Sequence, residues 1–474
     1  MSCRSCNQAF EPEDTVLICS LCKGVIECDH CRTQDRFCAP CWDRALLQQN
    51  PRPNFQADAP IVIEVAHIQS YAQKRKNLQL SLQKPKFVKQ ETTVPLVLAD
   101  HTTLVDLAHM PWPELKPNML ATLHPHELDK TVFLDETFNR HDYYVSYEND
   151  GKMEKENNVS TTTLLHIYFP SKDTFKLLKN TLMGKNWGSK PTCKYASFYT
   201  EDESQIPKNL VKIVKLWGKN KVDGAQLGKF VHFLIECDLN NVLNLASSPY
   251  ARYQHIRQYL WWKYTHFLPK YNAYRTEFRI RSCKKFRKVG TADFFAVRKD
   301  HLPPSETNGI LWIADFDWKC IRLQTFNFDN EKGIDLCNFM DNCNFSEYTF
   351  QQNDYGRFFE QDMYKNFIYN GHVYNKIRFE SMDLVVLSDE NPKPEEANIA
   401  PVSKEPELME QVWQRRAEEI AIWEAEGRPI IPKPVHPQLN DQELEDKCRE
   451  VMYEVEALMQ RGKQSLFKPK AIEL

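Results

Sequence analysis

Acidic residues and a lysine lie close together near the middle of the chain, within two apolar segments. Asp293 belongs to TADFFAVR, and Asp315, Asp317 and Lys319 belong to ILWIADFDWK. Both segments are short and rich in branched and aromatic residues, and a polar connection containing Pro-Pro-Ser separates them. This pattern is typical of two neighbouring strands of a hairpin, with Asp293 at the start of the first.

The second of these strands is expected to be buried on both faces and to turn polar only at its C-terminal end. Side chains alternate along a strand, so Asp315, Asp317 and Lys319 point to one side. Leu311 and Ile313 share that side, while aromatic residues and Ala314 occupy the other. Burying two carboxylates and an ammonium is costly unless they bind something, and a divalent cation is the most favourable partner. We therefore expect a metal site at this strand end.

Further candidate residues lie on the elements that must surround these strands. His232 and Glu236 are four residues apart in GKFVHFLIE, so they share one face of a predicted helix. A histidine on such a helix is more often structural than a ligand. Glu277 lies in the strand-like segment YRTEFRI. Gln351 and Tyr355 share a face of a second predicted helix.

A basic turn, RIRSCKKFRKVG, connects the strand of Glu277 to the strand of Asp293. A run of charge is usually a solvated loop, but this one joins two strands that bear carboxylates, so we predict that it contacts phosphate. Its basic residues are Arg279, Arg281, Lys284, Lys285, Arg287 and Lys288. The aromatic stretch over 249–271 could stack on bases, but we expect it to form core.

The N-terminus contains four CxxC pairs, which predict a module with two structural zinc ions. Two pairs complete one tetrahedral zinc site, and zinc would supply much of the folding free energy of so small a module. Only five residues separate the second pair from the third, which favours an interleaved cross-brace of the ZZ or RING type, although sequential pairing remains open. The cysteines are Cys3, Cys6, Cys19, Cys22, Cys28, Cys31, Cys38 and Cys41.

Composition limits the class of protein. The chain has 474 residues, of which 42% are hydrophobic and 26% charged, as expected for a globular protein with more than one domain. Its net charge of −3 argues against a uniformly basic nucleic-acid coat. No apolar run is long enough to cross a membrane, and the start lacks a signal-peptide pattern, so we expect a soluble intracellular protein without a membrane partner.

The remaining segments predict the supporting elements. YYVSY, from Tyr143, is a predicted strand, the polar run that follows it to Asn158 a loop, and Ser160 the start of a helix; FKLLKNTLM is a second helix. DLVVLSD is a final strand, and an acidic linker over 389–406 follows it. The tail is expected to form two amphipathic helices joined by the stiff spacer PIIPKPVHP, with Asn440 and Glu443 in a capping box at the second.

These elements follow one another as α-β-β-β-α-β, and at this point the chain resembles the PD-(D/E)XK nuclease superfamily. The resemblance is to its RecB-like and lambda-exonuclease-like branch, and especially to nucleases of large DNA viruses of eukaryotes. It covers residues 143–389. The motifs in order are G-x-x-x-H-x-x-x-E at 228–236, R-T-E at 275–277, G-T-x-D at 290–293, D-W-K at 317–319 and Q-x-x-x-Y at 351–355.

The resemblance implies a fold and a set of residue roles. It implies an α/β (α+β) restriction-endonuclease-like core that hydrolyses DNA. Asp293 and Asp317 would bind Mg²⁺ or Mn²⁺, helped by His232 and the backbone carbonyl of Trp318. Lys319 would position the attacking water. The remaining motif residues would have supporting roles: Glu277 and Glu236 would orient ligands, and Gln351 and Tyr355 would lie beside the metal and the DNA end.

The chain departs from the family at a few positions. Lys229 follows the motif glycine where relatives often have threonine, and Cys320 follows D-W-K where they often have a basic residue. Neither change removes a ligand. Some members of the branch hold an iron–sulfur cluster, but the cysteines near the core do not match that layout: Cys283, Cys320, Cys337 and Cys343.

Four regions are predicted: a two-zinc finger over 1–45, a linker over 46–140, a nuclease domain over 141–390, and a linker with a helical tail over 391–474. The leading hypothesis is a metal-dependent DNA exonuclease in replication, repair or recombination, with a finger that recruits a protein or nucleic acid. The alternative is a nuclease-derived scaffold without turnover that acts through its zinc finger. The retained aspartates and lysine favour catalysis.

Overall fold

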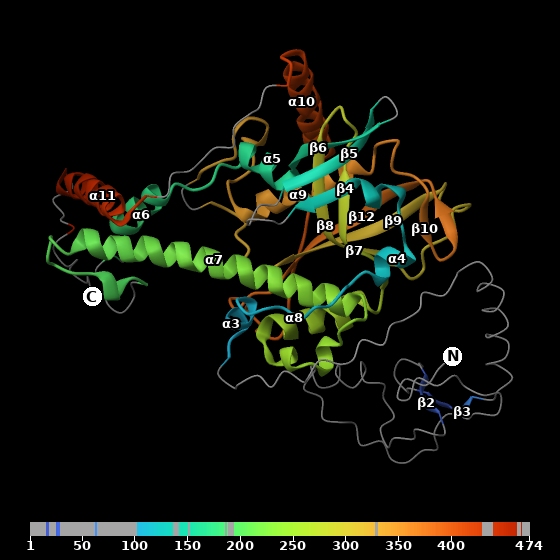
Figure 1. Ribbon diagram of the computed structural model, residues 1–474. Helices are drawn as coiled ribbons and strands as arrows, with labels where there is room; N and C mark the ends of the chain where they lie inside the picture. Colours follow the sequence, from blue (N-terminus) through green and yellow to red (C-terminus); the bar gives the residue numbers. More distant parts are fainter. Residues whose placement is uncertain are drawn as a thin grey trace.

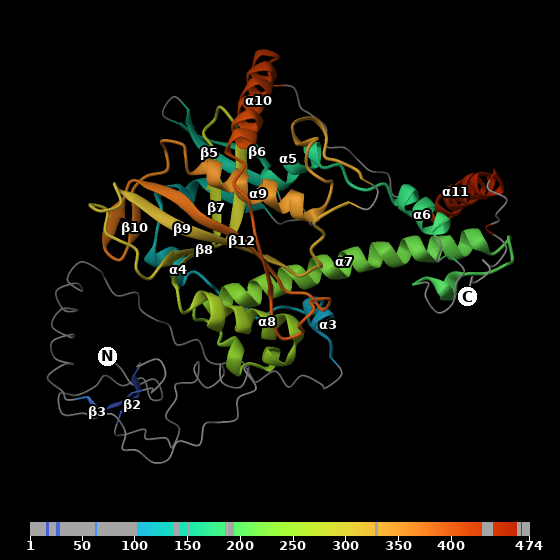
Figure 2. The same cartoon turned by 180° about the vertical axis from the view of Figure 1, so that it is seen from behind.

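The structure is a computed structural model of the chain (Figures 1 and 2). It describes residues 16–18, 25–28, 62–63, 102–135, 142–149, 152–184, 187, 194–327, 330–428, 439–461 and 466. The side chains of the eight cysteines predicted to bind zinc lie outside this part of the chain, and so does the predicted stiff spacer. Among the described residues, no helix combines the length and apolarity needed to span a membrane.

A mixed eight-stranded sheet forms the centre of the protein (Figure 1). Its order is β13-β12-β9-β8-β6-β5-β4, and β7 also pairs with β8. β12 runs parallel to β9 and β6 parallel to β8, while the other neighbours are antiparallel. The strands are β4 (Val132–Asp135), β5 (Asp142–Asn149), β6 (Lys152–Ser160), β7 (Tyr271–Arg281), β8 (Lys288–Arg298), β9 (Ile310–Lys319), β12 (Lys376–Val386) and β13 (Asn398–Pro401).

Smaller elements complete the strand inventory. A separate three-stranded sheet near the N-terminus has the order β2-β1-β3, and β10 pairs with β11 in a hairpin. These strands are β1 (Val16–Ile18), β2 (Val25–Cys28), β3 (Val62–Ile63), β10 (Phe367–Tyr369) and β11 (His372–Tyr374).

Helices cover both faces of the main sheet. One apolar core joins the sheet to α5, α9 and α10. A second core, on the other face, joins it to α3, α4, α8 and the C-terminal half of α7. The helices are α3 (Leu104–Ala108), α4 (Met119–Leu123), α5 (Thr161–Tyr168), α7 (Ile206–Leu239), α8 (Gln254–Trp262), α9 (Asn344–Phe358) and α10 (Pro406–Ala425).

The long helix α7 extends beyond the sheet (Figure 2). Its N-terminal half packs with α6 (Thr174–Met183) and α11 (Asp441–Arg461) around a third apolar core. α11 begins with the predicted capping box: Glu443 N–H donates to Asn440 Oδ1 at 3.0 Å, and Asn440 N–H donates to Glu443 Oε2 at 2.8 Å. One helix thus links this helical layer to the sheet.

β8 is the strand on which the centre of the sheet depends, because it has three partners. One edge pairs with β7 along most of its length. The other edge is shared: Lys288 and Val289 pair with β6, whereas the ladder with β9 runs from Phe294 to Val297. Residues 290–293 lie between these two ladders. The sheet therefore forks at Asp293, where a side chain can be reached from the diverging strands.

A buried ion pair joins β8 to α9. Lys288 and Asp354 are both fully buried and in contact. Asp354 Oδ2 also accepts a hydrogen bond from Thr161 at 2.7 Å, and Asp354 Oδ1 accepts one from the indole of Trp413 at 2.6 Å. Burial lowers the pKa of Lys288 to about 8, against the attraction of Asp354. Four elements, β8, α9, α5 and α10, therefore meet at one carboxylate.

The sequence predicted most of this core. The mixed sheet flanked by helices is confirmed, as is the hairpin of β8 and β9. The predicted alternation along β9 also holds: Leu311 and Ile313 belong to the core beneath α9, and Phe316 and Trp318 to the core beneath α7. The aromatic stretch before β7 is core, as expected. Asp293 does not start its strand, because β8 begins at Lys288.

Other predictions were wrong. The polar run predicted as a loop before Asn158 is strand β6, which is held by its backbone ladder to β5 rather than by an apolar pattern. The predicted acidic linker contains β13, which pairs with β12, and the next helix, α10, packs against α9. Residues 391–425 therefore belong with the sheet, and so does β4, which lies before the predicted boundary at 140.

The Lys288–Asp354 pair gives a prediction about stability. Asp354→Ala leaves an uncompensated ammonium in the interior, so it should lower the free energy of unfolding by about 3–5 kcal/mol. Chemical denaturation monitored by circular dichroism measures this. The matched control is Glu450→Ala, which breaks the exposed Lys447–Glu450 pair on α11 and should cost less than about 1 kcal/mol. Equal unfolding midpoints for the two variants would contradict the assignment.

Candidate active site

Three potential metal ligands from three different elements meet at the fork of the sheet. They are His232 on α7, Glu277 on β7 and Asp293 on β8, and one ligand atom from each lies within 4.8 Å of the other two. His232 and Asp293 keep 25% and 16% of their side-chain surface exposed. The group is therefore preassembled and still accessible from solvent.

The hydrogen bonds of His232 leave one ring nitrogen for a cation. Nε2 lies 3.0 Å from the Trp318 carbonyl, which only accepts, so Nε2 carries the proton. Burial, and after it the neighbouring Lys319, lowers the pKa of His232 to about 4, so the ring is neutral near pH 7. Nδ1 then directs a lone pair at Asp293 Oδ2, 3.5 Å away. Two acceptors that face each other are well suited to sharing a metal ion.

Glu277 reaches this group because its backbone is left-handed, with φ of 44°. Such a φ is unfavourable for any residue other than glycine, and it breaks the alternation of the strand. Thr276 bonds to Asn240 on α7, yet Phe278, two residues further on, packs in the opposite core against Phe295. The strain falls on a candidate ligand, as is common at functional sites.

Asp317 and Lys319 lie beside this group, at the end of β9. Asp317 Oδ2 is 2.6 Å from Lys319 Nζ, and a side-chain hydrogen bond links Asp317 to Asp293. Burial and then Asp293 raise the pKa of Asp317 well above its ordinary value, against the effect of Lys319. Asp293 also accepts the Trp318 N–H at 3.1 Å. Asp293 and Asp317 therefore share the positive charge of Lys319 and a hydrogen bond between their carboxyl groups.

Asp315 extends this acidic cluster into the core. It is 1% exposed, and among the described residues its Oδ2 has no hydrogen-bond partner. Burial, followed by Asp317 and Asp293, raises its pKa well above the ordinary range. Asp315 does not belong to the three-residue ligand group. Its environment therefore favours the protonated form of the carboxyl group.

Helix α9 closes the site from one side. Gln351 Nε2 donates to the Tyr355 hydroxyl at 2.7 Å, which brings the two predicted residues together. The Tyr355 ring lies so close to Gly290 that a Cβ there would be 2.6 Å from ring atom Cε1. Two helical turns before Tyr355, the ring of Tyr348 lies under the Lys319 ammonium, with 4.1 Å between Nζ and the ring centre. The helical spacing of Tyr348 was visible in the sequence, but its contact with Lys319 was not.

Glu236 adds a further carboxyl near Asp293. Burial raises its pKa to about 7, partly opposed by Arg279. With Glu236 included, four carboxyl groups interact electrostatically with Asp293, and Lys319 lies beside them. Binding of a cation among these carboxyl groups is therefore strongly favoured. Hard oxygen donors together with one imidazole suit Mn²⁺ and Mg²⁺ better than a soft metal ion.

The residues predicted to form the metal site thus lie close together, but the position of Glu277 differs from the prediction. Glu277, predicted to orient ligands, lies in the ligand group itself, whereas Asp317 is engaged with Lys319 and Asp293. The Trp318 carbonyl, predicted as a ligand, accepts a hydrogen bond from His232 Nε2–H. A carbonyl oxygen has a second lone pair, which can bind a cation. The left-handed backbone conformation of Glu277 could not be predicted from the sequence.

The predicted phosphate contact of the basic turn needs correction. Arg287 is 4% exposed and pairs with Glu156 and Glu424, and Lys288 is fully buried. These two residues are therefore removed from any surface that could bind phosphate. Arg281 is half-buried and donates to Thr131, and Lys284 lies 3.7 Å from Glu156. Two residues remain exposed, Arg279 and Lys285, and Arg279 is close enough to Glu236 to lower its pKa.

Comparison with known proteins gives no family for the chain. No protein-family model matches the sequence, and no curated protein matches it. The function is therefore argued from the site.

The close contact between the Tyr355 ring and Gly290 can be tested by measuring the stability of variants. Gly290→Ala places a methyl group against a buried ring, so it should lower the free energy of unfolding by about 1–3 kcal/mol. In a Tyr355→Ala background the same change should cost much less, because the two residues are coupled. Gly218→Ala on α7 is the control: a Cβ there meets no atom within 4 Å, and alanine favours a helix. Additive effects at Gly290 and Tyr355 would contradict the contact.

Glu236 predicts a pH dependence of stability. Its folded pKa, about 7, exceeds the ordinary 4.5, so its contribution is full below about pH 4.5 and is lost as pH rises through 7. Without metal, the wild type should therefore lose more thermal stability between about pH 5 and 8 than Glu236→Gln. Melting temperatures across this range, in a chelator, measure the difference. Parallel profiles for the two proteins would show that Glu236 is not responsible.

Proposed function

We propose that this chain is a divalent-metal-dependent nuclease of the PD-(D/E)XK type that hydrolyses DNA phosphodiester bonds from an end. One observation supports this above the others: His232, Glu277 and Asp293 converge at the fork where Asp317 and Lys319 end β9. The elements that carry them follow the order α7-β7-β8-β9-α9-β12, as the resemblance requires. An acidic, half-open centre with a single buried ammonium suits phosphate chemistry.

Mg²⁺ or Mn²⁺ would be held by His232 Nδ1 and by the carboxylates of Glu277 and Asp293. The donor set fits, because the neutral ring leaves a lone pair facing a carboxylate. A bound divalent cation supplies Lewis acidity, which lowers the pKa of water and neutralises charge on a phosphate. Asp317 can join the ligands, since its hydrogen bond to Asp293 shows that it is within reach.

Lys319 is the residue placed to act on the substrate. Its ammonium is held between Asp317 and the Tyr348 ring, and its side chain is 12% exposed. Burial disfavours its charge, but Asp317 and Asp293 more than compensate and raise its pKa, so it remains protonated. A fixed positive charge can orient the attacking water and stabilise the charge that develops on the scissile phosphate. Lys319 therefore acts as a charge stabiliser rather than a general base.

Preference for DNA ends rests on Gln351 and Tyr355. Their hydrogen bond presents the amide and the phenol of α9 together, beside Gly290 and the aspartates. Exposed Arg279 and Lys285 remain available for the DNA backbone. The two-zinc N-terminal finger would recruit a protein partner or nucleic acid, and the C-terminal helices could serve the same purpose.

The first test is digestion of end-labelled linear DNA beside covalently closed circular DNA, with Mg²⁺ or Mn²⁺. Wild type should degrade the linear form alone. Asp317→Ala should lower the rate on the order of 10³-fold or more, by analogy with losing a preorganised charge stabiliser. Asp300→Asn is the control, because this exposed carboxylate pairs with Arg298 at the other end of β8 and should leave the rate unchanged.

Measurements of metal and DNA binding distinguish the nuclease hypothesis from the hypothesis of a catalytically inactive scaffold. Calorimetry with Mn²⁺ should detect binding to wild type that Glu277→Ala weakens at least tenfold. If wild type digests no DNA or RNA but still binds DNA or a protein partner, the catalytic proposal fails and the zinc-finger adaptor becomes the better explanation. Digestion of the circular form as well would instead indicate an endonuclease.

A further inference from the structure

Helix α10 contacts α9, the helix of Gln351 and Tyr355, partly through a buried hydrogen bond. Trp413 donates its indole N–H to Asp354 Oδ1 at 2.6 Å, and both side chains are buried. The Trp413 ring also packs against Phe286 and Phe358, and the Lys288 ammonium lies 4.3 Å from its centre. Arg416 on the same helix donates to the Phe286 carbonyl at 3.1 Å. The basic turn between β7 and β8 thus forms a cradle for α10.

This contact is one residue away from the candidate active site. Asp354 precedes Tyr355, and Lys288 lies two residues before Gly290, which the Tyr355 ring touches. Thr161 connects the two sides: its hydroxyl bonds to Asp354, and a Cβ at Gly290 would lie 3.3 Å from the same oxygen. The position of α9 relative to β8 is therefore fixed by groups that converge on the Asp354 carboxylate.

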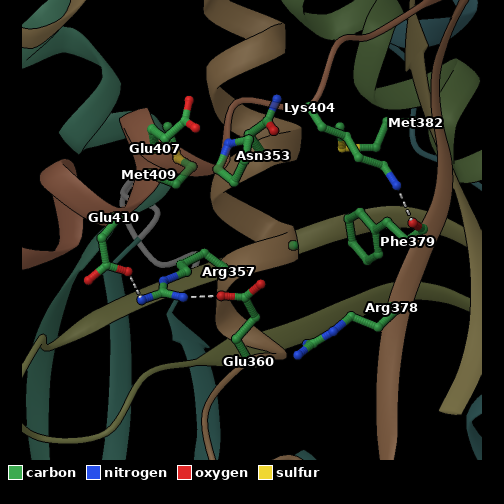
Figure 3. A pocket seen from close by; sticks show the side chains of 12 residues that line it. Asn353, Arg357, Glu360, Arg378, Phe379, Met382, Lys404, Glu407, Met409 and Glu410 are labelled. Atoms are coloured by element: carbon green, nitrogen blue, oxygen red, sulfur yellow. Dashed lines mark hydrogen bonds and ion pairs between the residues drawn. The ribbon is translucent and has the colours of Figure 1, made fainter.

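The interface between α9 and α10 also contains a pocket and an ion pair. A cavity of about 460 Å³ lies between α9, β12 and the first turn of α10 (Figure 3). Its lining includes Gly356, Phe379 and Met409, and none of the proposed catalytic residues. Arg357 of α9 spans this region and pairs with Glu410 of α10. This ion pair adds a second polar contact between α9 and α10, beside the hydrogen bond of Trp413.

We infer that Trp413 is a positioning residue for catalysis: through Asp354 it holds α9 so that Tyr355 and Gln351 stand in register with Asp293. This role rests on the proposed nuclease function. The α9 backbone is rigid, so a shift at Asp354 moves the next residue with it. Misplacement on the order of 1 Å can lower a rate about 100-fold without loss of binding.

Two conservative variants test the inference in the full chain. Trp413→Phe keeps an aromatic ring over Lys288 but removes the N–H, and Thr161→Val removes the hydroxyl at nearly constant shape. Each should lower kcat roughly 10- to 100-fold at saturating linear DNA, with KM and Mn²⁺ affinity changed less than about threefold. Trp423→Phe is the matched control: it lies on α10 and stacks on Arg287, so kcat should stay within about twofold of wild type.

A second readout does not require activity. Hydrogen exchange of peptides from α9 should become faster in Trp413→Phe and Thr161→Val, while peptides from α11 remain unchanged. If the wild type proves not to be a nuclease, this measurement still tests the link between α10 and α9. Unchanged kcat and unchanged α9 exchange, with lowered stability alone, would overturn the inference. An equal loss of kcat in Trp423→Phe would also overturn it.

Discussion

An excess of buried negative charge dominates the centre of this protein. Asp293 interacts electrostatically with four other carboxyl groups at the fork of the sheet, and among the described residues Lys319 is the ammonium that lies beside them. These carboxyl groups belong to Glu236, Glu277, Asp315 and Asp317. In a poorly solvated site such a cluster holds protons or a cation. The neutral ring of His232 directs its lone pair into the same place. A bound divalent cation would compensate this charge.

The backbone makes such a cluster possible. The second edge of β8 has no ladder over residues 290–293, because it is divided between β6 and β9, and this opens the sheet at Asp293. The left-handed Glu277 turns a carboxylate toward the opening from the neighbouring strand. On the far side, contact between Gly290 and Tyr355 brings α9 close to β8. The Asp354 carboxylate, shared by Lys288, Thr161 and Trp413, holds that approach in place.

The basic turn before β8 illustrates where reasoning from charge goes astray. Six basic residues between two strands suggested a phosphate-binding loop, yet Arg287 and Lys288 neutralise buried carboxylates and support α10. The sequence contained no sign of this, because Glu156, Asp354 and Glu424 lie far from the turn in sequence. In the sequence, a cation and an anion that are far apart look like two separate surface charges, because only the fold shows that they form a buried pair.

The sequence by itself determined the local features: the strands of Asp293 and Asp317, the helices of His232 and Tyr355, their order, and the alternation that puts Asp315, Asp317 and Lys319 on one side. These follow from apolar periodicity and side-chain spacing, which depend on near neighbours alone. Tertiary structure decided that Glu277 joins His232 and Asp293, that a polar run becomes β6, and that α10 is bound to α9. Each of these depends on backbone pairing, a strained dihedral angle or a buried charge partner that is distant in the chain, and periodicity encodes none of them.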